Sequence, residues 1–441
     1  MLAARREVDD LNGRGGQVHY LVNRRYLEGA MVHVSLPATG PQVELVDERT
    51  GAFRLVPGVQ ARDGRLEFDY YFGAADSAMF FVPNSPLALR PASMVRQLAV
   101  APALRRLSAD MTLAACDDNL LTLDRCRYRV EGGEWQSCDI ISLQSRLIVL
   151  KRDVDVELEI PFLVADDLDL ATPLTLVVET PRLFTMALNG VPFSNTDTGY
   201  AFDSAFRTVP LPPALRVGEN VLSLSLRYHQ EESLYSRLEA ARQFETEYNM
   251  LTFETELESV YLKGRFGVRH TGATEELPRE AMRCNGTFAL CAPSLGRTVD
   301  AGDLLLSAGL PFFAGSATLE AHVTLTAAEA AAATALRFRP QGANSWKVAV
   351  NGQPVGDCYW EPYIVEVAGL LHEGDNAITF TLTTSLRNLL GPHHLAEGES
   401  YAVATTSFNI EPNFVGRPAP ANVPGYCLVR HGLADIELVA R

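Results

Sequence analysis

Two copies of one sequence pattern decide the fold: FTMALNGVP at residues 184–192 and WKVAVNGQP at residues 346–354. In each copy, apolar and polar residues alternate up to an Asn-Gly pair. Such alternation predicts a strand with one buried face. Asn-Gly is typical of a type I′ turn, whose two central residues need positive φ. Each copy therefore predicts a β-hairpin.

A second matched pair lies downstream, LRVGENVLSL at residues 215–224 and LHEGDNAITF at residues 371–380. Both place a glycine and an asparagine just before an alternating strand. The spacing between copies is 162 residues from Asn189 to Asn351 and 156 residues from Gly218 to Gly374. Nearly constant spacing predicts two tandem β-domains of one kind, and so long a period argues against a solenoid or propeller.

The first hundred residues also alternate, in short runs separated by turn residues, at 18–22, 31–36, 66–72 and 78–82. This spacing predicts a β-sandwich. The predicted fold is all-β, with a β-sandwich over 1–100 and tandem domains over 105–268 and 280–441. A short helix is expected over 231–244, where Leu234, Leu238 and Ala241 follow helical spacing. The alanine-rich residues 327–333 favour a helix by propensity, with a loop insertion as the alternative.

Composition limits the partners. The 441 residues are 47% hydrophobic and 21% charged, enough to bury several cores, and the net charge of −16 would repel nucleic acid and anionic membranes. No apolar run is long enough to span a membrane, and the N-terminus lacks a signal-peptide core, so a cytoplasmic location is expected. The seven scattered cysteines form no CxxC pair and are expected to be buried or idle thiols.

Two segments in the last third have the residue types that bind sugars. Aromatic rings beside Pro362 offer apolar faces, and downstream amide, guanidinium and imidazole groups offer hydrogen bonds. The alternative is that the same side chains pack the domain edge and hold a loop together. The candidate carbohydrate-binding residues are Tyr359, Trp360, Tyr363, Arg387, Asn388, His393 and His394.

The same region carries a family resemblance. VNGQPVG (350–356), the loop 360–363 and LLHEGDNAITFTL (370–382) resemble the sugar-binding jelly-roll domain of glycoside hydrolase family two. SLRNLLGPHH (385–394) is similar to the C-terminal galactose-binding-like domains of bacterial alpha-L-rhamnosidase-type glycoside hydrolases. The resemblance covers residues 105–441 and implies two tandem jelly-roll, galactose-binding-like domains. It also implies that the first hundred residues are the β-sandwich that often follows a catalytic barrel.

In that family the catalytic carboxylates lie on a (β/α)₈ barrel, and this chain shows no sustained alternation of strands and helices to build one. Glu254, Glu256 and Glu258 would share one face of a strand, and a solvated acidic face explains them better than catalysis. The pairs Asp117-Asp118 and Asp166-Asp167 have the oxygen ligands that calcium prefers, in a spacing that is not diagnostic. No catalytic residue or metal ligand is assigned, and no cofactor is expected beyond a structural calcium ion.

The first hypothesis is an accessory, carbohydrate-associated region or subunit of a bacterial glycoside hydrolase, whose partners are carbohydrate and a catalytic barrel chain. The second is a hydrolase in its own right, with a carboxylate pair assembled between domains. The third is a structural assembly module. Turnover of aryl-glycosides, binding without turnover, and association with a barrel chain would distinguish the three.

Overall fold

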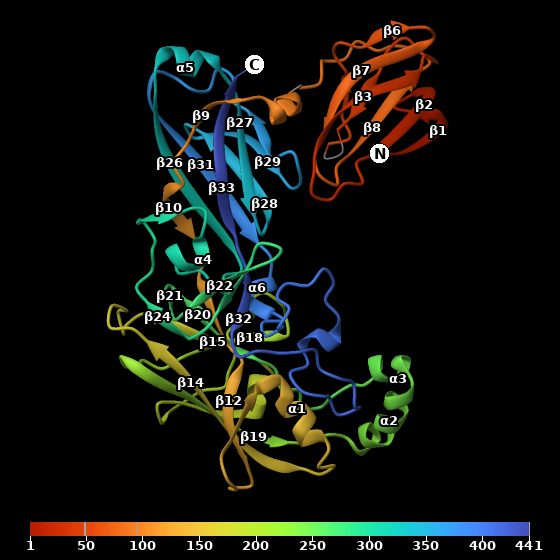
Figure 1. Ribbon diagram of the computed structural model, residues 1–441. Coiled ribbons are helices and arrows are strands. Elements are labelled where there is room, and N and C mark those ends of the chain that lie inside the picture. Colours follow the sequence, from red (N-terminus) through yellow and green to blue (C-terminus); the bar gives the residue numbers. More distant parts are fainter. Residues whose placement is uncertain (48–49, 94, 441) are drawn as a thin grey trace.

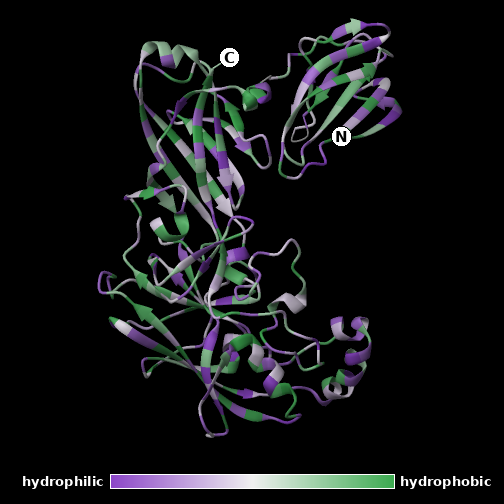
Figure 2. Cartoon of the chain, in the orientation of Figure 1, coloured by the Kyte–Doolittle hydropathy of each residue, from purple (hydrophilic) through white to green (hydrophobic). Residues whose placement is uncertain are grey.

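The computed structural model describes residues 1–47, 50–93 and 95–440. Strands account for 48% of residues and helices for 12%, which confirms the all-β prediction (Figure 1). Along most strands, green hydrophobic and purple hydrophilic residues alternate (Figure 2). Two sheets can therefore pack face to face, each contributing its apolar side to a shared core.

The N-terminal residues form a sandwich of their own. Phe68, Tyr70 and Phe80 pack edge to face in its core, with ring centroids 5.1 Å apart for both pairs that include Phe80. One sheet has the order β1-β2-β8-β4-β5, namely Leu2–Leu11, Arg14–Val22, Ser77–Pro83, Glu44–Val46 and Phe53–Leu55. The other has the order β3-β7-β6, namely Ala30–Pro37, Arg65–Phe72 and Gln60–Arg62.

The middle of the chain forms a second sandwich around the largest core cluster. Its four-stranded sheet is β11-β20-β15-β18, namely Asn119–Leu123, Val260–Gly264, Leu174–Glu179 and Phe206–Pro210. Its eight-stranded sheet runs β13-β12-β14-β19-β16-β17, namely Gln136–Asp139, Arg125–Val130, Val154–Val164, Gly218–Tyr228, Phe184–Leu188 and Val191–Phe193. β24 (Thr287–Cys291) joins this sheet beside β14 and also pairs with β21 (Gly267–Thr271).

A third sandwich surrounds the fully buried Trp346 and Phe380. Its six-stranded sheet is β25-β10-β26-β31-β28-β29, namely Thr298–Asp300, Asp110–Cys116, Ser316–Leu325, Gly374–Thr384, Ala343–Val350 and Gln353–Cys358. The facing sheet is β30-β27-β33-β9, namely Ile364–Glu366, Ala333–Gln341, Gly432–Ala440 and Ala103–Arg106. A small sheet, β22-β23-β32 (Thr274–Leu277, Ala281–Cys284 and Tyr426–Val429), lies between the second and third sandwiches (Figure 1).

The strands that pair within a sheet do not always come from neighbouring parts of the chain. β9 and β10 pair with β33, β25 and β26, so residues 103–116 belong to sheets otherwise built from residues after 297. β24 pairs in parallel with β14 of the second sandwich. The domain ranges 1–100, 105–268 and 280–441 stay a prediction, and the chain passes between the second and third sandwiches more than once.

The repeated hairpins form as predicted. β16 and β17 turn at Asn189-Gly190, and β28 and β29 turn at Asn351-Gly352. All four turn residues have positive φ, between 50° and 79°. The two hairpins pair next to the long alternating strands β19 and β31, respectively. The internal repeat therefore corresponds to the same supersecondary unit in two sandwiches.

Few helices interrupt the sheets. α2 (Glu232–Gln243) confirms the expected helix, with Leu234, Leu238 and Ala241 buried, and α5 (Ala327–Ala332) confirms helix for the alanine-rich stretch. α1 (Ile140–Ile148) was not predicted, because its isoleucines read equally well as strand. The others are α3 (Glu245–Asn249), α4 (Leu304–Ser307), α6 (Arg387–Leu390), η1 (Val95–Val100), η2 (Pro181–Leu183) and η3 (Thr405–Phe408). Among the described residues, every helix is too short or too polar to cross a membrane.

Candidate functional site

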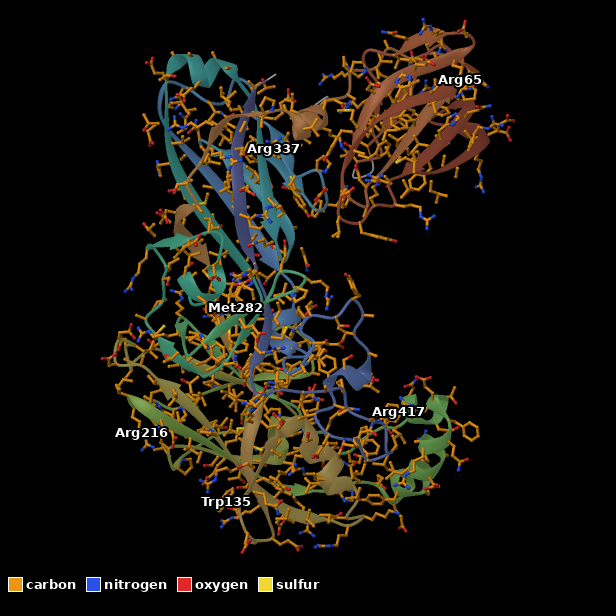
Figure 3. All side chains as sticks on the ribbon, in the orientation of Figure 1. Arg65, Trp135, Arg216, Met282, Arg337 and Arg417 are labelled. Carbon is orange, nitrogen blue, oxygen red and sulfur yellow. The ribbon has the colours of Figure 1, made fainter. Side chains whose placement is uncertain are left out.

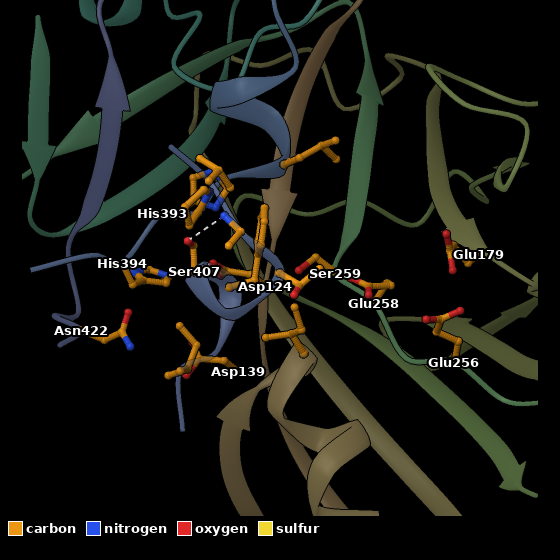
Figure 4. A pocket seen from close by; sticks show the side chains of 18 of the residues that line it. Asp124, Asp139, Glu179, Glu256, Glu258, Ser259, His393, His394, Ser407 and Asn422 are labelled. Carbon is orange, nitrogen blue, oxygen red and sulfur yellow. Dashed lines mark hydrogen bonds and ion pairs between the residues drawn. The ribbon is translucent and has the colours of Figure 1, made fainter. Parts of the chain in front are cut away.

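A cavity of about 690 Å³ opens between the second sandwich and the segment 390–422 (Figure 4). Five carboxylic acids and two histidines reach it, together with aromatic and small apolar side chains. Its polar lining includes Asp124, Asp139, Glu179, Glu256, Glu258, Ser259, His393, His394, Thr405, Ser407 and Asn422. Its apolar and aromatic lining includes Ile141, Phe206, Tyr248, Tyr261, Leu390, Pro392, Val403, Phe408 and Ile410.

Several of these side chains stand where strands begin or end. Asp124 joins β11 to β12, and Asp139 is the last residue of β13, so the two lie near each other at the open end of one hairpin, one at the end of each strand. Glu179 is the last residue of β15, and Tyr261 lies on β20 beside it in the same sheet. The edge of the second sandwich thus supplies the cavity floor from residues far apart in sequence.

Glu256 and Glu258 come from an irregular segment, and no strand in the described part of the chain pairs with it. Its hydrogen bonds come from side-chain amides instead: Gln230 Nε2 donates to the Thr255 carbonyl at 2.5 Å, and Gln144 Nε2 donates to the same oxygen at 3.2 Å. Thr255 and Leu257 are buried between the glutamates. The alternation read from sequence therefore holds, but the predicted strand over 254–258 was wrong, since β20 begins only at Val260.

The three glutamates on this side of the cavity hold their protons more tightly than usual. Burial, with the nearby Glu179 and Glu256 charges, raises the pKa of Glu258 to about 7. Burial and the Glu256 charge raise the pKa of Glu179, and burial raises that of Glu256. Within the described part of the chain, no side chain donates a hydrogen bond or ion pair to Glu179 or Glu256, and Glu258 accepts only the Ser259 backbone N–H.

The opposite side of the cavity is a closed hydrogen-bond network around Asp124. His394 Nε2 lies 2.9 Å from one Asp124 oxygen, and the Tyr426 hydroxyl donates to the other at 2.6 Å. Burial alone would raise the pKa of Asp124, but hydrogen bonding to His394, the electrostatic attraction of His394 and the hydrogen bond from Tyr426 hold it below its ordinary value. Asp124 therefore stays ionised where Glu258 is half protonated at neutral pH, which separates the two carboxyl groups chemically.

The predicted sugar-binding residues lie in three separate places. Tyr359 and Trp360 are 44% and 46% exposed and line a smaller pocket of about 290 Å³ beside the N-terminal sandwich. Glu361 of this loop accepts the Ala74 backbone N–H at 2.8 Å, which ties the loop to that sandwich. Tyr363 packs on Phe338 with ring centroids 5.8 Å apart.

Of the other four predicted residues, two line a separate cavity of about 290 Å³, namely Arg387 and Asn388. Arg387 forms an ion pair with Glu399, its Nε donating at 2.8 Å, and Asn388 is buried and exchanges two hydrogen bonds of 2.8 Å with the Val429 backbone. His393 and His394 line the cavity itself. Burial lowers the pKa of His393 to about 4, so this ring is neutral, and its Nε2 donates to the Asn388 carbonyl at 2.9 Å.

Sequence reasoning missed most of the cavity. It singled out Glu256 and Glu258 with Glu254, which does not line the cavity, and it did not find Asp124, Glu179 or Tyr261. These three occupy ordinary strand ends, and only the fold brings them to the glutamate pair.

The two aspartate pairs proposed for calcium lie in loops away from the cavity. Asp118 pairs with Lys263 at 2.7 Å, Asp117 accepts the Ser316 backbone N–H at 2.8 Å, and Asp167 pairs with Arg269. Across residues 1–47, 50–93 and 95–440, no three or more His, Cys, Asp or Glu side chains gather as a metal would require.

No protein-family model matches this chain, and no curated protein does. Solved structures with a partial likeness include the rhamnosidase from Novosphingobium sp. PP1Y, at 14% identity over 59% of this chain and 25% of that one, with a TM-score of 0.20. The beta-D-mannosidase from Dictyoglomus thermophilum aligns at 12% sequence identity over 60% of this chain and 31% of that one, with a TM-score of 0.22. The alpha-L-rhamnosidase from Streptomyces avermitilis, solved in complex with L-rhamnose, aligns at 11% sequence identity over 84% of this chain and 34% of that one, with a TM-score of 0.23. This chain thus spans about a third of these proteins or less.

Proposed function

We propose that this chain is a carbohydrate-binding protein of the glycoside-hydrolase-like kind and that its ligand occupies the acidic cavity. The observation that carries the proposal is a set of carboxyl groups, on Glu179, Glu256 and Glu258, that line one cavity and that no cationic side chain among the described residues pairs with. Carboxylates accept hydrogen bonds and donate none when ionised. A ligand rich in hydroxyl donors satisfies them without bringing in a charge.

The size and wall chemistry of the cavity support the same ligand class. Binding pockets for small ligands commonly enclose about 300–1,000 Å³, and this one encloses about 690 Å³. Tyr248, Phe206 and Phe408 add aromatic surface among the polar groups. A pyranose ring, with apolar C–H faces and a hydroxyl rim, matches that mixture.

Binding is tested by calorimetry or ligand-observed NMR with a panel of monosaccharides and short oligosaccharides. Glu256→Gln keeps the shape of the side chain but replaces an acceptor oxygen with a donor, and we expect at least tenfold weaker binding. Glu254→Gln is the matched control, because Glu254 is, like Glu256, an exposed glutamate of the same segment but does not line the cavity. Equal affinity in both variants would contradict the proposal.

A second candidate function, hydrolysis by this chain alone, is favoured by the raised pKa of Glu258. Glycoside hydrolysis uses one carboxylic acid that stays protonated and a second that is ionised. Glu258 supplies the first property near neutral pH, and Asp124, whose pKa is held below its ordinary value, supplies an ionised carboxylate on the opposite side of the cavity. Release of the aryl group from aryl-glycosides, abolished in Glu258→Gln, would establish the hydrolase. Binding without turnover in the purified chain would exclude it and leave the binding function.

The accessory role and the catalytic barrel partner belong to the same proposal. The exposed Tyr359-Trp360 loop provides aromatic surface outside the cavity, at the junction with the N-terminal sandwich. In this arrangement the cavity holds one part of a glycan while a separate barrel chain cleaves another. Co-purification of the tagged chain from its native cells should recover a barrel protein, and recovery only of unrelated proteins would leave the binding role standing alone.

A further inference from the structure

We propose that Cys126 and Cys138 are a redox-active thiol pair, which a small-molecule disulfide such as glutathione disulfide converts into an intrachain disulfide. Their sulfur atoms lie 3.8 Å apart, and the two residues are direct cross-strand partners in the β12–β13 hairpin. This modification site goes beyond the carbohydrate function and does not depend on it.

The register explains why these two thiols meet. Residues directly opposite on antiparallel strands point to the same face of the sheet. A disulfide needs the sulfurs at about 2.05 Å, so the strands must approach slightly. β13 is a four-residue strand at the sheet edge, and among the described strands it pairs only with β12, so no second described strand resists that movement.

Another pair of cysteines on adjacent strands shows the contrast. Cys284 lies on β23 and Cys427 on β32, but Cys284 is opposite Tyr426 and Cys427 is opposite Arg283. One residue out of register places their side chains on opposite faces of the sheet. Adjacent strands alone therefore do not make a reactive pair, whereas the register of Cys126 and Cys138 does.

The surroundings divide the chemical roles between the two thiols. Cys126 is buried, whereas Cys138 is partly accessible. The hydrogen bond with Cys126 and the nearby Arg146 guanidinium lower the pKa of Cys138, while that hydrogen bond and burial raise the pKa of Cys126. Because the thiolate is the attacking species, Cys138 reacts first.

The reaction balances as two exchange steps. The Cys138 thiolate attacks one sulfur of glutathione disulfide, forms a mixed disulfide and releases one glutathione thiolate, which takes up the Cys126 proton. The Cys126 thiolate then attacks the Cys138 sulfur and displaces the second glutathione. The protein pair is oxidised by two electrons, and one glutathione disulfide is reduced to two glutathione molecules.

The disulfide would join the two strands whose outer ends carry cavity residues. Asp124 lies two residues before Cys126, and Asp139 directly follows Cys138. Arg125 Nε already donates to Asp139 at 3.3 Å across the same hairpin. The modification therefore cross-links the hairpin just below the cavity floor.

The experiment incubates the full, native chain with glutathione disulfide, blocks remaining thiols by alkylation, and measures mass and tryptic peptides. We expect two of the seven thiols to disappear, with the dipeptide Cys126-Arg127 joined to the peptide covering 130–146. A folded protein that keeps all seven thiols, or that keeps glutathione on Cys138 without forming the cross-link, would overturn the proposal.

Variants separate the two steps. Oxidation of the Cys126→Ser protein should stop at the mixed disulfide, with one glutathione bound to Cys138. In the Cys138→Ser protein, no two thiols should disappear together. Cys116→Ser is the control, since Cys116 lies in another sheet and should leave the cross-link unchanged. Loss of two thiols in Cys138→Ser would contradict the assignment. The wild-type peptide map decides the question even if a variant fails to fold.

Discussion

At the scale of single residues, Glu258 is the most chemically distinctive group in the molecule. Its carboxyl is largely removed from water beside the buried Leu257, and the negative charges of Glu179 and Glu256 are nearby. Both surroundings disfavour ionisation, so the folded chain binds this proton more tightly than the unfolded chain does. The Glu258 carboxyl therefore makes the free energy of unfolding depend on pH, and it is also a potential proton donor.

The first prediction concerns that coupling. The folded pKa of Glu258, about 7, lies above the ordinary value of 4.5, so its contribution to stability is greatest below pH 4.5 and falls as pH rises to about 7. Glu258→Gln cannot ionise and should be more stable than wild type by about 1–3 kcal/mol at pH 8, and nearly equal at pH 4.5. Urea unfolding across pH 4.5–8 measures the difference.

Glu254→Gln is the control for this series, because Glu254 is exposed and its substitution should give a flat difference over the same range. A stability gain in Glu258→Gln that does not grow with pH would contradict the assigned pKa.

The second prediction concerns the aromatic loop. Trp360 is 46% exposed and contacts Tyr359 with ring centroids 5.8 Å apart, so its removal leaves no cavity in a core. Trp360→Ala should change stability by less than about 0.5 kcal/mol. If the loop binds sugar, affinity for an oligosaccharide should fall severalfold, as calorimetry would measure. Tyr26→Ala, at an 81% exposed aromatic in the N-terminal sandwich, is the control.

Unchanged oligosaccharide affinity in a folded Trp360→Ala protein would remove the loop from the binding surface. Because Trp360 and the acidic cavity are separate pockets, that result would leave the cavity proposal intact.

At the scale of elements, the two repeated hairpins share one hydrogen-bond arrangement as well as one turn. Asn376 is fully buried; its Oδ1 accepts from Asn351 Nδ2 at 2.9 Å and from the His372 backbone N–H at 3.0 Å. Asn220 accepts in the same way from Asn189 at 2.8 Å and from the Arg216 N–H at 3.0 Å. Each asparagine thus fastens a hairpin to the loop before the next strand.

The third prediction follows from this arrangement. Asn376→Ala leaves buried backbone groups without partners and should lower the free energy of unfolding by about 2–4 kcal/mol. Asn220→Ala, the equivalent change in the second sandwich, should cost a similar amount. Asn351→Gly removes fewer hydrogen bonds and suits the positive φ of 51° there, so it should cost less. Thermal or urea unfolding ranks the three.

A neutral Asn376→Ala would mean that the matched asparagines only mark the turn and do not stabilise it. If Asn376→Ala and Asn220→Ala lower the free energy of unfolding by different amounts, the two sandwiches depend differently on the shared motif.

At the scale of the whole molecule, the N-terminal sandwich has its own core, and one of its contacts with the rest of the chain is the hydrogen bond from the Ala74 backbone N–H to Glu361. Arg337, on β27 (Figure 3), contacts the linker that joins this sandwich to the rest of the chain. Its Nη1 donates to the carbonyls of Leu98, Ala99 and Ala101 at 2.6–3.3 Å, and it pairs with Glu437. The linker residues 98–101 and the Glu437 carboxylate, and not the sandwich, therefore satisfy this arginine.

The fourth prediction uses that boundary. A chain of residues 93–441 keeps η1 and should unfold at nearly the same temperature as the corresponding transition of the full chain. A chain of residues 103–441 also loses the three carbonyls bound by Arg337 and should be less stable by about 1–3 kcal/mol. Differential scanning calorimetry compares them. Equal stability of the two truncations would show that the Arg337 contacts contribute little.

The sequence by itself determined the β class, the two hairpins and the helix over 231–244, because alternation, Asn-Gly turns and helical spacing are local properties of the chain. It also determined that Glu256 and Glu258 face the same way. The tertiary structure decided what they face. Glu179, Asp124 and His394 come from distant parts of the chain, and no local pattern encodes where separate strand ends meet. For the same reason, the side-chain amides of Gln144 and Gln230 hold the glutamate segment where a neighbouring strand was expected. The repeat specifies the scaffold, and long-range packing of its edges creates the cavity.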